Sequence, residues 1–503
     1  MNEKNNRLNL TFRNNKVKLF PKHKLDIFNH INTGLPTQAE ATALFDRATA
    51  LGSPFPDADK PYVNEAIYYL KQTDQWAQLD SIGKFDVHSR IAALIDWKNP
   101  SRSFTTAGDY TGDFTAYSGF KGNNTSFRID TGLNFSTGAW NYTRNSAIKG
   151  VYVDSNETGS TKLELSNESA SNAGITTLMQ GSATPKTVVH ATNNGSDLNF
   201  VPIVQLYGWQ ISKRDNSANY VVLKNGINIS RYTKETASTA IPNANINLLC
   251  RNIGGVYSQF STRRIKGFFA GGGSADAIKI VNGLNKHSLG MNSIPKKAVL
   301  VDGNSFTRYG HYIDKVFRNY GASNLVADFV QGEVGRTTAE MTADFTATIG
   351  SVVLTGYTHK VLFAWEVTND MYANASNATT TYNNLVAYCQ QARATFGSDL
   401  KIIVGTCLPR GGSNPITAAN RQNPLDLYDA TTLNGKIRNN ADGAWDAVCD
   451  VASDATMGVD SGGVAGVGEK NTTYYDVDEI HPTTTGYQYL ADNYIYASIN
   501  AYL

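Results

Sequence analysis

Two stretches far apart in this chain carry side chains that together could perform acyl transfer. Ser305 follows an apolar run, and Asp478 and His481 stand three residues apart near the end of the 503 residues. A serine hydroxyl, an imidazole and a carboxylate are the parts of a nucleophilic triad, in which the histidine takes the serine proton and the carboxylate orients the imidazole. The three residues therefore predict a serine hydrolase.

The local sequence also predicts which elements position these side chains. The run Ala298-Val299-Leu300-Val301 is typical of a buried strand, and the segment from Arg308 to Tyr320 has the apolar spacing of a helix. We expect Ser305 at the carboxyl end of the strand, beside free N–H groups of a helix start, which favour a developing oxyanion. Pro482 favours an extended backbone at His481, so a short loop should present the imidazole.

Further apolar runs continue this pattern towards the end of the chain, and helix-length segments separate them. The runs are Leu325-Val326-Ala327, Val361 to Trp365, Ile402-Ile403-Val404 and Val448 to Val451. Continuous apolar strands that alternate with helices are typical of a parallel sheet covered on both faces. We predict an α/β domain over residues 298–503.

Four short blocks in fixed order resemble the SGNH (GDSL-like) hydrolase family over about residues 296–503. The blocks are Gly303-Asn304-Ser305, the run Gly-Glu-Val-Gly-Arg-Thr-Thr at 332–338, the run Trp-Glu-Val-Thr-Asn-Asp at 365–370, and Asp478-x-x-His481. The resemblance implies a flavodoxin-like three-layer domain and a carboxylic ester hydrolase. Two positions depart from the family pattern, since Asn304 stands where Asp is usual and Val367 where Gly is usual.

The same resemblance implies roles for individual residues. Ser305 would be the nucleophile, His481 the general base and Asp478 its partner. The oxyanion hole would consist of the Ser305 N–H, the Gly335 N–H and the side-chain amide of Asn369. No cofactor and no metal is implied.

Three further polar residues flank the expected pocket. Arg336, Glu366 and Asp370 are candidates for substrate binding, and the alternative interpretation is that they form structural hydrogen bonds.

The first half of the chain divides into an N-terminal attachment or extended segment (1–35), a helical region (36–84), a β-sandwich (85–285) and a linker (286–297). Apolar spacing predicts helices from Thr37 to about Leu51 and from Tyr62 to Leu79. Short alternating runs with turn residues between them predict an all-β sandwich, with Arg90 to Ile95 among its strands.

The strand rhythm of the sandwich, together with runs such as residues 92–97 (Ala-Ala-Leu-Ile-Asp-Trp), resembles concanavalin-like jelly-roll lectin domains, which implies glycan recognition. Four aromatic residues could either stack on sugar rings or pack in the core: Trp140, Tyr142, Tyr207 and Trp209.

Bulk properties exclude several classes of function. A formal charge of +2 without a basic block argues against nucleic acid as a partner, and no apolar run is long enough to span a membrane. The four cysteines show no metal-ligand spacing, so we expect buried free thiols. The first residues lack the apolar core of a signal peptide, which predicts synthesis in the cytoplasm without ordinary secretion.

Together these patterns predict a modular serine esterase that removes O-acyl groups, most plausibly O-acetyl, from a polysaccharide or cell-surface glycan. A lectin-like region joined to an esterase-like domain resembles bacteriophage tail spikes and fibres, which implies a homotrimer in the virion tail, in contact with other tail proteins. Two alternatives remain open: a receptor-binding tail protein without catalysis, and a bacterial surface or secreted carbohydrate esterase.

Overall fold

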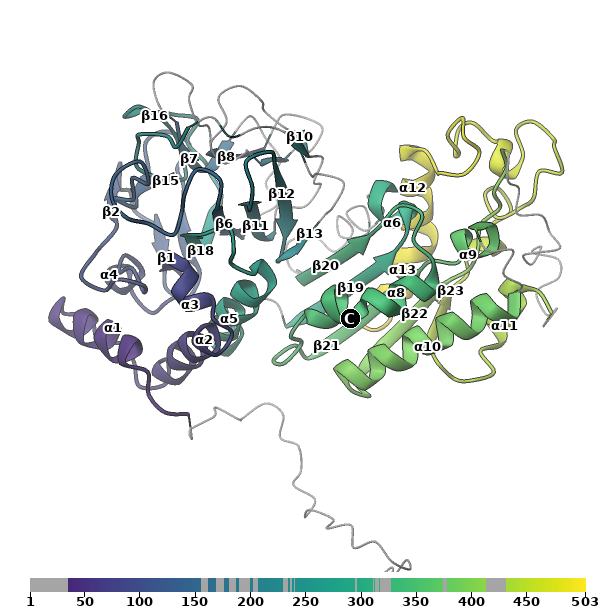
Figure 1. Ribbon diagram of the computed structural model, residues 1–503, viewed down its shortest axis with the longest axis horizontal. Coiled ribbons are helices and arrows are strands. Elements are labelled where there is room, and N and C mark those ends of the chain that lie inside the picture. The colour runs from purple at the N-terminus through teal and green to yellow at the C-terminus, as the bar shows by residue number, and fades with distance from the viewer. Residues whose placement is uncertain are drawn as a thin grey trace, which may run out of the picture.

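The computed structural model describes residues 35–154, 162–168, 176–180, 187–189, 200–201, 207–228, 234–235, 238, 240–294, 296–310, 312, 316, 327–373, 378–412 and 431–503. Figure 1 shows two lobes, with antiparallel strands and the first helices in one and a parallel sheet between helices in the other. The predicted attachment segment lies outside the described residues, apart from residue 35.

The helical region is shorter than predicted. Helix α1 spans Ala39–Ala50 and α2 spans Lys60–Gln72, close to two expected positions. The second predicted helix was wrong in its last third, because Asp74 takes a positive φ of 61° and ends it. A short helix α3 (Gln75–Gln78) and strand β1 (Leu79–Lys84) follow, and β1 pairs within the β region.

Two antiparallel sheets build the β region. The first has the order β13-β12-β11-β6-β18-β4-β3, with β1 paired to β18 and β14 to β12. Its strands are β3 (Phe114–Thr115), β4 (Gly119–Lys121), β6 (Ala147–Val153), β11 (Gly208–Arg214), β12 (Asn219–Lys224), β13 (Ile227–Asn228), β14 (Lys234–Glu235) and β18 (Arg264–Gly271), besides β1.

The second antiparallel sheet has the order β10-β9-β8-β7-β15-β5-β2. Its strands are β2 (Thr105–Ala107), β5 (Arg128–Asp130), β7 (Lys162–Asn167), β8 (Thr176–Gln180), β9 (Thr187–Val189), β10 (Phe200–Val201) and β15 (Asn247–Leu248), and a separate hairpin joins β16 (Arg251–Ile253) to β17 (Val256–Ser258). One hydrophobic core contains Phe120 and Val151 of the first sheet and Ile129 and Leu165 of the second.

One predicted strand of this region is a helix. Residues Arg90–Ala93 form α4, because the Ser89 side chain accepts a hydrogen bond from the Ala92 N–H and caps the turn. The residues that suggested a lectin-like strand at 92–97 therefore lie in a helix and the turn after it. Of the four aromatic residues considered for sugar stacking, Tyr142, Tyr207 and Trp209 are buried in the core, whereas Trp140 is partly exposed.

The predicted linker begins inside a helix. Helix α5 (Ala277–Gly290) starts where the Asp276 side chain accepts hydrogen bonds from the Ile278 and Lys279 N–H groups. It packs on α2, so the early helices and α5 form one unit beneath the β region.

The C-terminal lobe contains the predicted parallel sheet, in the order β20-β19-β21-β22-β23. Its strands are β19 (Lys297–Gly303), β20 (Ala327–Gly332), β21 (His359–Trp365), β22 (Leu400–Gly405) and β23 (Ala447–Cys449). In chain order this is 2-1-3-4-5, the doubly wound order of flavodoxin-like sheets. The strand predicted at 325–327 begins at Ala327 and runs further than expected.

Helices cover both faces of this sheet (Figure 1). Alternate strand residues separate into two cores: Leu300 and Leu362 pack with residues of α10 (Ala378–Phe396), while Val299 and Phe363 pack with residues of α12 (Thr484–Leu490). The remaining helices are α6 (Ser305–Gly310), α8 (Thr338–Asp344), α9 (Thr368–Ala373), α11 (Leu433–Asn439), a π-helix at Ala491–Ile495, α13 (Tyr496–Asn500), and 3-10 turns at Phe345–Ala347, Ile349–Ser351, Val451–Ser453 and Gly468–Lys470.

A buried polar contact joins the two lobes. Lys224, at the end of β12, forms an ion pair with Asp328 of β20, and both side chains are at most 8% exposed. The neighbouring Asn225 amide donates to the Asp328 carbonyl oxygen at 2.7 Å. Removing one partner of such a buried pair is strongly destabilising, so the contact contributes to holding the two lobes together.

All four cysteines are buried free thiols, as predicted. Within the described ranges, no helix combines the length and the apolar character needed to cross a lipid bilayer.

Candidate active site

The structure brings Ser305, His481 and Asp478 into one hydrogen-bonded line. The Ser305 Oγ and the His481 Nε2 lie 2.9 Å apart, and the His481 Nδ1 and the Asp478 Oδ2 lie 2.6 Å apart. Both distances are within hydrogen-bond reach, which a nucleophile and its general base require. The hydroxyl, the imidazole and the carboxylate thus stand in the order that proton transfer from the serine needs.

A tight loop holds the imidazole and the carboxylate together. The second carboxylate oxygen of Asp478 accepts the backbone N–H groups of Ile480 at 2.9 Å and His481 at 3.0 Å. Glu479 between them takes a positive φ of 57°, which turns the chain back within three residues. Burial raises the pKa of Asp478, but the hydrogen bonds from His481 and Ile480 outweigh it and lower this pKa below its usual value. Asp478 therefore stays ionised beside the imidazole.

The loop is tied to the segment that follows β22. The Gly411 N–H donates to the Glu479 carbonyl oxygen at 2.8 Å, and the Gly412 N–H donates to the Glu479 side chain at 2.9 Å. Lys470 pairs with the same carboxylate at 2.8 Å. These contacts fix the position of a loop that would otherwise be a surface turn.

Ser305 is the first residue of α6, directly after β19. Its neighbour Asn304 accepts the Phe306 N–H on its side-chain oxygen at 2.8 Å and so caps the helix. The change from the usual Asp to Asn304 keeps this cap, because an amide oxygen accepts as a carboxylate oxygen does. The Ser305 N–H has no acceptor within its own helix, since it belongs to the first turn.

Hydrogen bonds connect the segment around Gly335 to Asn369 and to the end of β19. The Asn369 side-chain amide donates to the carbonyl oxygen of Arg336, the residue after Gly335, at 3.0 Å. The Glu333 N–H donates to the Gly303 carbonyl oxygen at 3.2 Å, two residues before Ser305. Gly335 has a positive φ of 77° and is exposed, which suits a backbone N–H presented to a ligand.

The three candidates for substrate binding, Arg336, Glu366 and Asp370, are buried side chains that form hydrogen bonds within the protein. All three are at most 3% exposed and bonded to the protein. Arg336 pairs with Asp302 of β19 and also donates to the Gly303 carbonyl oxygen at 2.9 Å. Its guanidinium therefore clamps the strand end that precedes the nucleophile, as the structural interpretation of this residue expects, and substrate binding by Arg336 stays a prediction.

Glu366 and Asp370 support the third block. Glu366 accepts the Asn369 N–H at 3.1 Å, and Asp370 accepts the N–H of Thr338, the first residue of α8, at 2.7 Å. Burial, and then the negative charge of Asp370, raise the pKa of Glu366 well above its usual range, which favours the neutral carboxyl form. A neutral Glu366 adds no negative charge next to Asn369, one of the predicted oxyanion donors.

The sequence did not indicate Arg410. Its guanidinium lies 3.4 Å from the Asn369 side-chain oxygen, so that oxygen faces Arg410 and the amide nitrogen faces Arg336. Arg410 follows β22 and precedes the glycines that hold the histidine loop. Its place after a strand of the parallel sheet was the available signal, because the carboxyl edge of such a sheet gathers functional loops.

Two hollows adjoin this edge of the sheet. The smaller, of about 440 Å³, is lined by Glu333, Gly335, Arg336 and Glu340 among others. The larger, of about 790 Å³, lies between the lobes and shares Glu333 with the first. Among the described residues, no cluster of three or more His, Cys, Asp or Glu side chains is arranged to hold a metal ion.

Comparison with known proteins gives matches among solved structures alone. No protein-family model matches the chain. No curated protein matches it either.

Similar solved structures include a protein named as a GDSL-like lipase from Parabacteroides merdae (11% identity, TM-score 0.31, covering 42% of this chain and 98% of that one). They also include the esterase EstA from Pseudoalteromonas sp. (13%, 0.28, 41% and 97%) and protein YXIM from Bacillus subtilis (11%, 0.31, 75% and 79%). A GDSL-like lipase and an esterase are thus among the structures similar to part of this chain.

Proposed function

We propose that this chain is a serine ester hydrolase that removes O-acyl groups, most plausibly O-acetyl, from a polysaccharide. One observation carries the proposal: Ser305, His481 and Asp478 form a continuous hydrogen-bonded line with distances of 2.9 and 2.6 Å. The three side chains come from remote parts of one domain, and only its fold brings them together in this order.

The proposed reaction uses the contacts of each side chain. The Ser305 Oγ attacks the ester carbonyl carbon while the His481 Nε2 takes its proton, and the imidazolium that forms is stabilised by the ionised Asp478. The negative charge that forms on the carbonyl oxygen is stabilised by hydrogen bonds from the N–H groups of Ser305 and Gly335 and from the side-chain amide of Asn369. His481 then gives the proton to the leaving alkoxide, and the acyl group stays on Ser305. A water molecule, deprotonated by His481, attacks this acyl carbon, and the acid is released as Ser305 regains its proton.

Hydrolysis of p-nitrophenyl acetate tests the nucleophile. We expect Ser305→Ala and His481→Ala each to lower kcat at least about 1,000-fold, as triad removal does in other serine hydrolases. A fluorophosphonate probe should label the wild type at Ser305 and leave Ser305→Ala unlabelled. Equal rates for the wild type and Ser305→Ala would reject catalysis and favour a protein that only binds glycan.

The polysaccharide substrate is the finer part of the proposal. It is supported by the two-lobed architecture, in which a β-rich region accompanies the hydrolase domain, and by a sequence rich in Asn, Thr, Ser and Gly with only 17% charged residues. Measuring the acetate released from a panel of O-acetylated polysaccharides tests this choice of substrate. If the protein hydrolyses p-nitrophenyl acetate but releases acetate from no polysaccharide, the esterase activity stands and the polysaccharide substrate is rejected.

We further propose that the protein acts as part of a bacteriophage tail, as a homotrimer. The pairing of a β-rich region with an esterase domain supports this setting. Light scattering coupled to gel filtration measures the stoichiometry, and mass spectrometry of purified particles measures the location. A monomer that is absent from particles would favour a bacterial surface or secreted esterase.

A further inference from the structure

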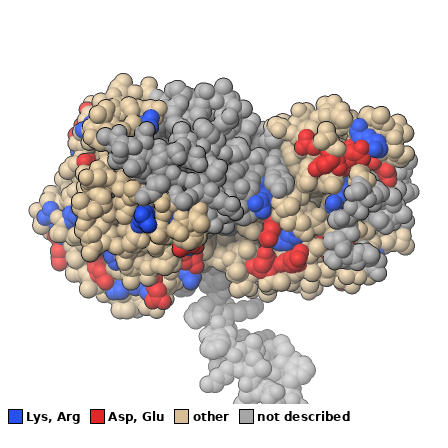
Figure 2. Space-filling model, turned by 45° about the horizontal axis from the view of Figure 1, so that its top comes forward, with Lys and Arg blue, Asp and Glu red and all other residues tan. Residues whose placement is uncertain are grey.

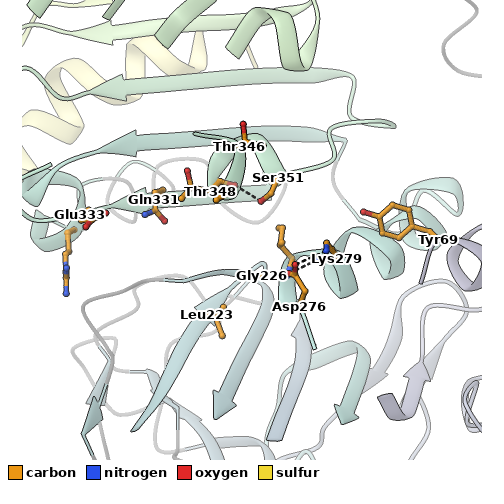
Figure 3. Close-up of a pocket in the computed structure, with 13 residues that line it drawn as sticks. Tyr69, Leu223, Gly226, Asp276, Lys279, Gln331, Glu333, Thr346, Thr348 and Ser351 are labelled. Atoms are coloured by element: carbon orange, nitrogen blue, oxygen red, sulfur yellow. Dashed lines mark hydrogen bonds and ion pairs between the residues drawn. The ribbon is translucent and has the colours of Figure 1, made fainter. Parts of the chain in front are cut away.

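The larger hollow is a cleft between the two lobes, and both lobes line it. Figure 3 shows Leu223, Gly226 and Lys279 of the first lobe opposite Gln331 and Thr348 of the second. Its volume of about 790 Å³ falls within the range of ligand sites in proteins, roughly 300–1,000 Å³.

Two elements next to the proposed nucleophile line the cleft. Arg308, which lines it, lies one helical turn after Ser305 on α6. Gln331 and Glu333 line it from the carboxyl end of β20, which pairs in register with the strand that ends at Gly303. Glu333 also lines the hollow that contains Gly335. Helix α6 and the carboxyl end of β20 thus connect the segment that contains the nucleophile to one wall of the cleft.

Buried contacts lie beside the cleft. The buried Lys224–Asp328 pair spans the lobes next to Leu223 and Gly226. Gly226 has a φ of +87° and packs against the start of α5, where a Cβ atom would lie 2.5 Å from the Ile278 Cα. A preformed site binds with less loss of conformational entropy than one that must close.

The lining indicates the chemistry of the ligand. Two cations, Lys279 and Arg308, are balanced by two anions, Asp276 and Glu333, so the cleft does not favour a polyanion. Figure 2 likewise shows acidic side chains, with a few basic ones among them, near the junction of the two lobes. The other contributions include hydroxyl and amide groups and the ring of Tyr69, whose phenol points towards the cleft (Figure 3). Such groups match the hydroxyls and ring faces of neutral sugars.

We propose that this cleft binds the glycan chain of the substrate, and that the chain is a neutral, hydroxyl-rich polysaccharide. The proposal rests on the esterase function above, since it identifies the alcohol side of the ester. It gives both lobes a share in substrate binding and assigns the β-rich lobe a wall of the site.

A substitution that fills the cleft tests this proposal. Ala347 is exposed and lines the cleft, whereas Ala339 is equally exposed on α8 and lines neither hollow. Both are changed to Trp in the Ser305→Ala background, so that binding is measured without turnover. The probes are neutral and uronic-acid-containing O-acetylated polysaccharides, and affinity electrophoresis and calorimetry measure Kd at low and high salt.

We expect Ala347→Trp to weaken binding of a neutral glycan at least about 10-fold, while Ala339→Trp leaves it unchanged, with little dependence on salt. Unchanged binding in Ala347→Trp, or the absence of binding to every neutral polysaccharide, would overturn the proposal. Preference for the uronic-acid polymers, with loss at high salt, would overturn the neutral assignment. Failure of the esterase function is separate, because it would appear as no acetate release by the wild type.

Discussion

Replacing Asp478 by Asn separates the role of its charge from that of its shape. One oxygen of Asp478 accepts two backbone N–H groups, of Ile480 and His481, and the other faces the His481 Nδ1. In the variant, the amide oxygen must keep facing the two N–H groups, because an NH₂ group there would meet two donors. The NH₂ group then donates to the His481 Nδ1 and fixes the tautomer whose Nε2 carries a proton.

A protonated Nε2 cannot take the proton of Ser305. We therefore expect kcat for p-nitrophenyl acetate to fall about 10⁴-fold, or about 5 kcal/mol in activation free energy, as in a triad with the same substitution. The two backbone hydrogen bonds remain and the carboxylate is partly exposed, so the free energy of unfolding should fall by only about 1 kcal/mol at pH 7.

The matched control is Asp476→Asn, which removes the same charge from an exposed position two residues earlier in the loop. It should retain the rate of the wild type. The pKa of Asp478 is lowered in the fold, so its ionised form stabilises the protein above the unfolded value of 3.8, and this contribution is lost as the pH falls through the native pKa. Wild type and Asp478→Asn should thus converge in stability in acid. If Asp478→Asn kept more than about a tenth of the wild-type kcat, the carboxylate would not control the tautomer.

Three further substitutions probe other parts of the molecule. Asn369→Ala should lower kcat about 100- to 1,000-fold and the free energy of unfolding by about 1–3 kcal/mol, because the Arg336 carbonyl oxygen loses a buried donor; a loss of activity confined to KM would reject its role as an oxyanion donor. Lys224→Met should lower the free energy of urea unfolding by about 3–5 kcal/mol, because it removes the cation paired with the buried Asp328 carboxylate. Combining it with Asp328→Leu should recover most of this cost, and an additive loss would contradict that reason. Burial lowers the pKa of His287 from 6.5 to about 3, so the unfolded chain binds its proton first as the pH falls, and this group should remove about 1.5–2 kcal/mol of stability between pH 6.5 and 5. Denaturation curves of wild type and His287→Gln with the same pH slope would show that the imidazole is protonated in the fold.

Several elements could be predicted from the sequence because their signals are local. The strand at 298–301 and the strand at 361–365 are continuous apolar runs, and the structure has β19 and β21 there. The helix expected near residue 39 also formed, since its apolar spacing marks a buried face. In each case a run of neighbouring residues carries the whole signal.

Other elements were predicted wrongly because a single residue decided them. Residues 90–95 have the apolar content of a strand, but Ser89 caps a helix there. The helix expected to reach Leu79 stops near Asp74, after which β1 joins a sheet whose partner, β18, lies almost 200 residues further along the chain. A single helix-capping residue, or a strand partner far along the chain, leaves little trace in a short stretch of sequence.

The sequence by itself determined which side chains were available for acyl transfer and the order of their blocks along the chain. Only the tertiary structure decided that Ser305 and His481 meet, that Arg336, Glu366 and Asp370 are buried, and that Arg410 contacts Asn369. The physical reason is that exposure and distance depend on how strands from remote parts of the chain align at one edge of the sheet, whereas residue type and spacing are fixed before the chain folds.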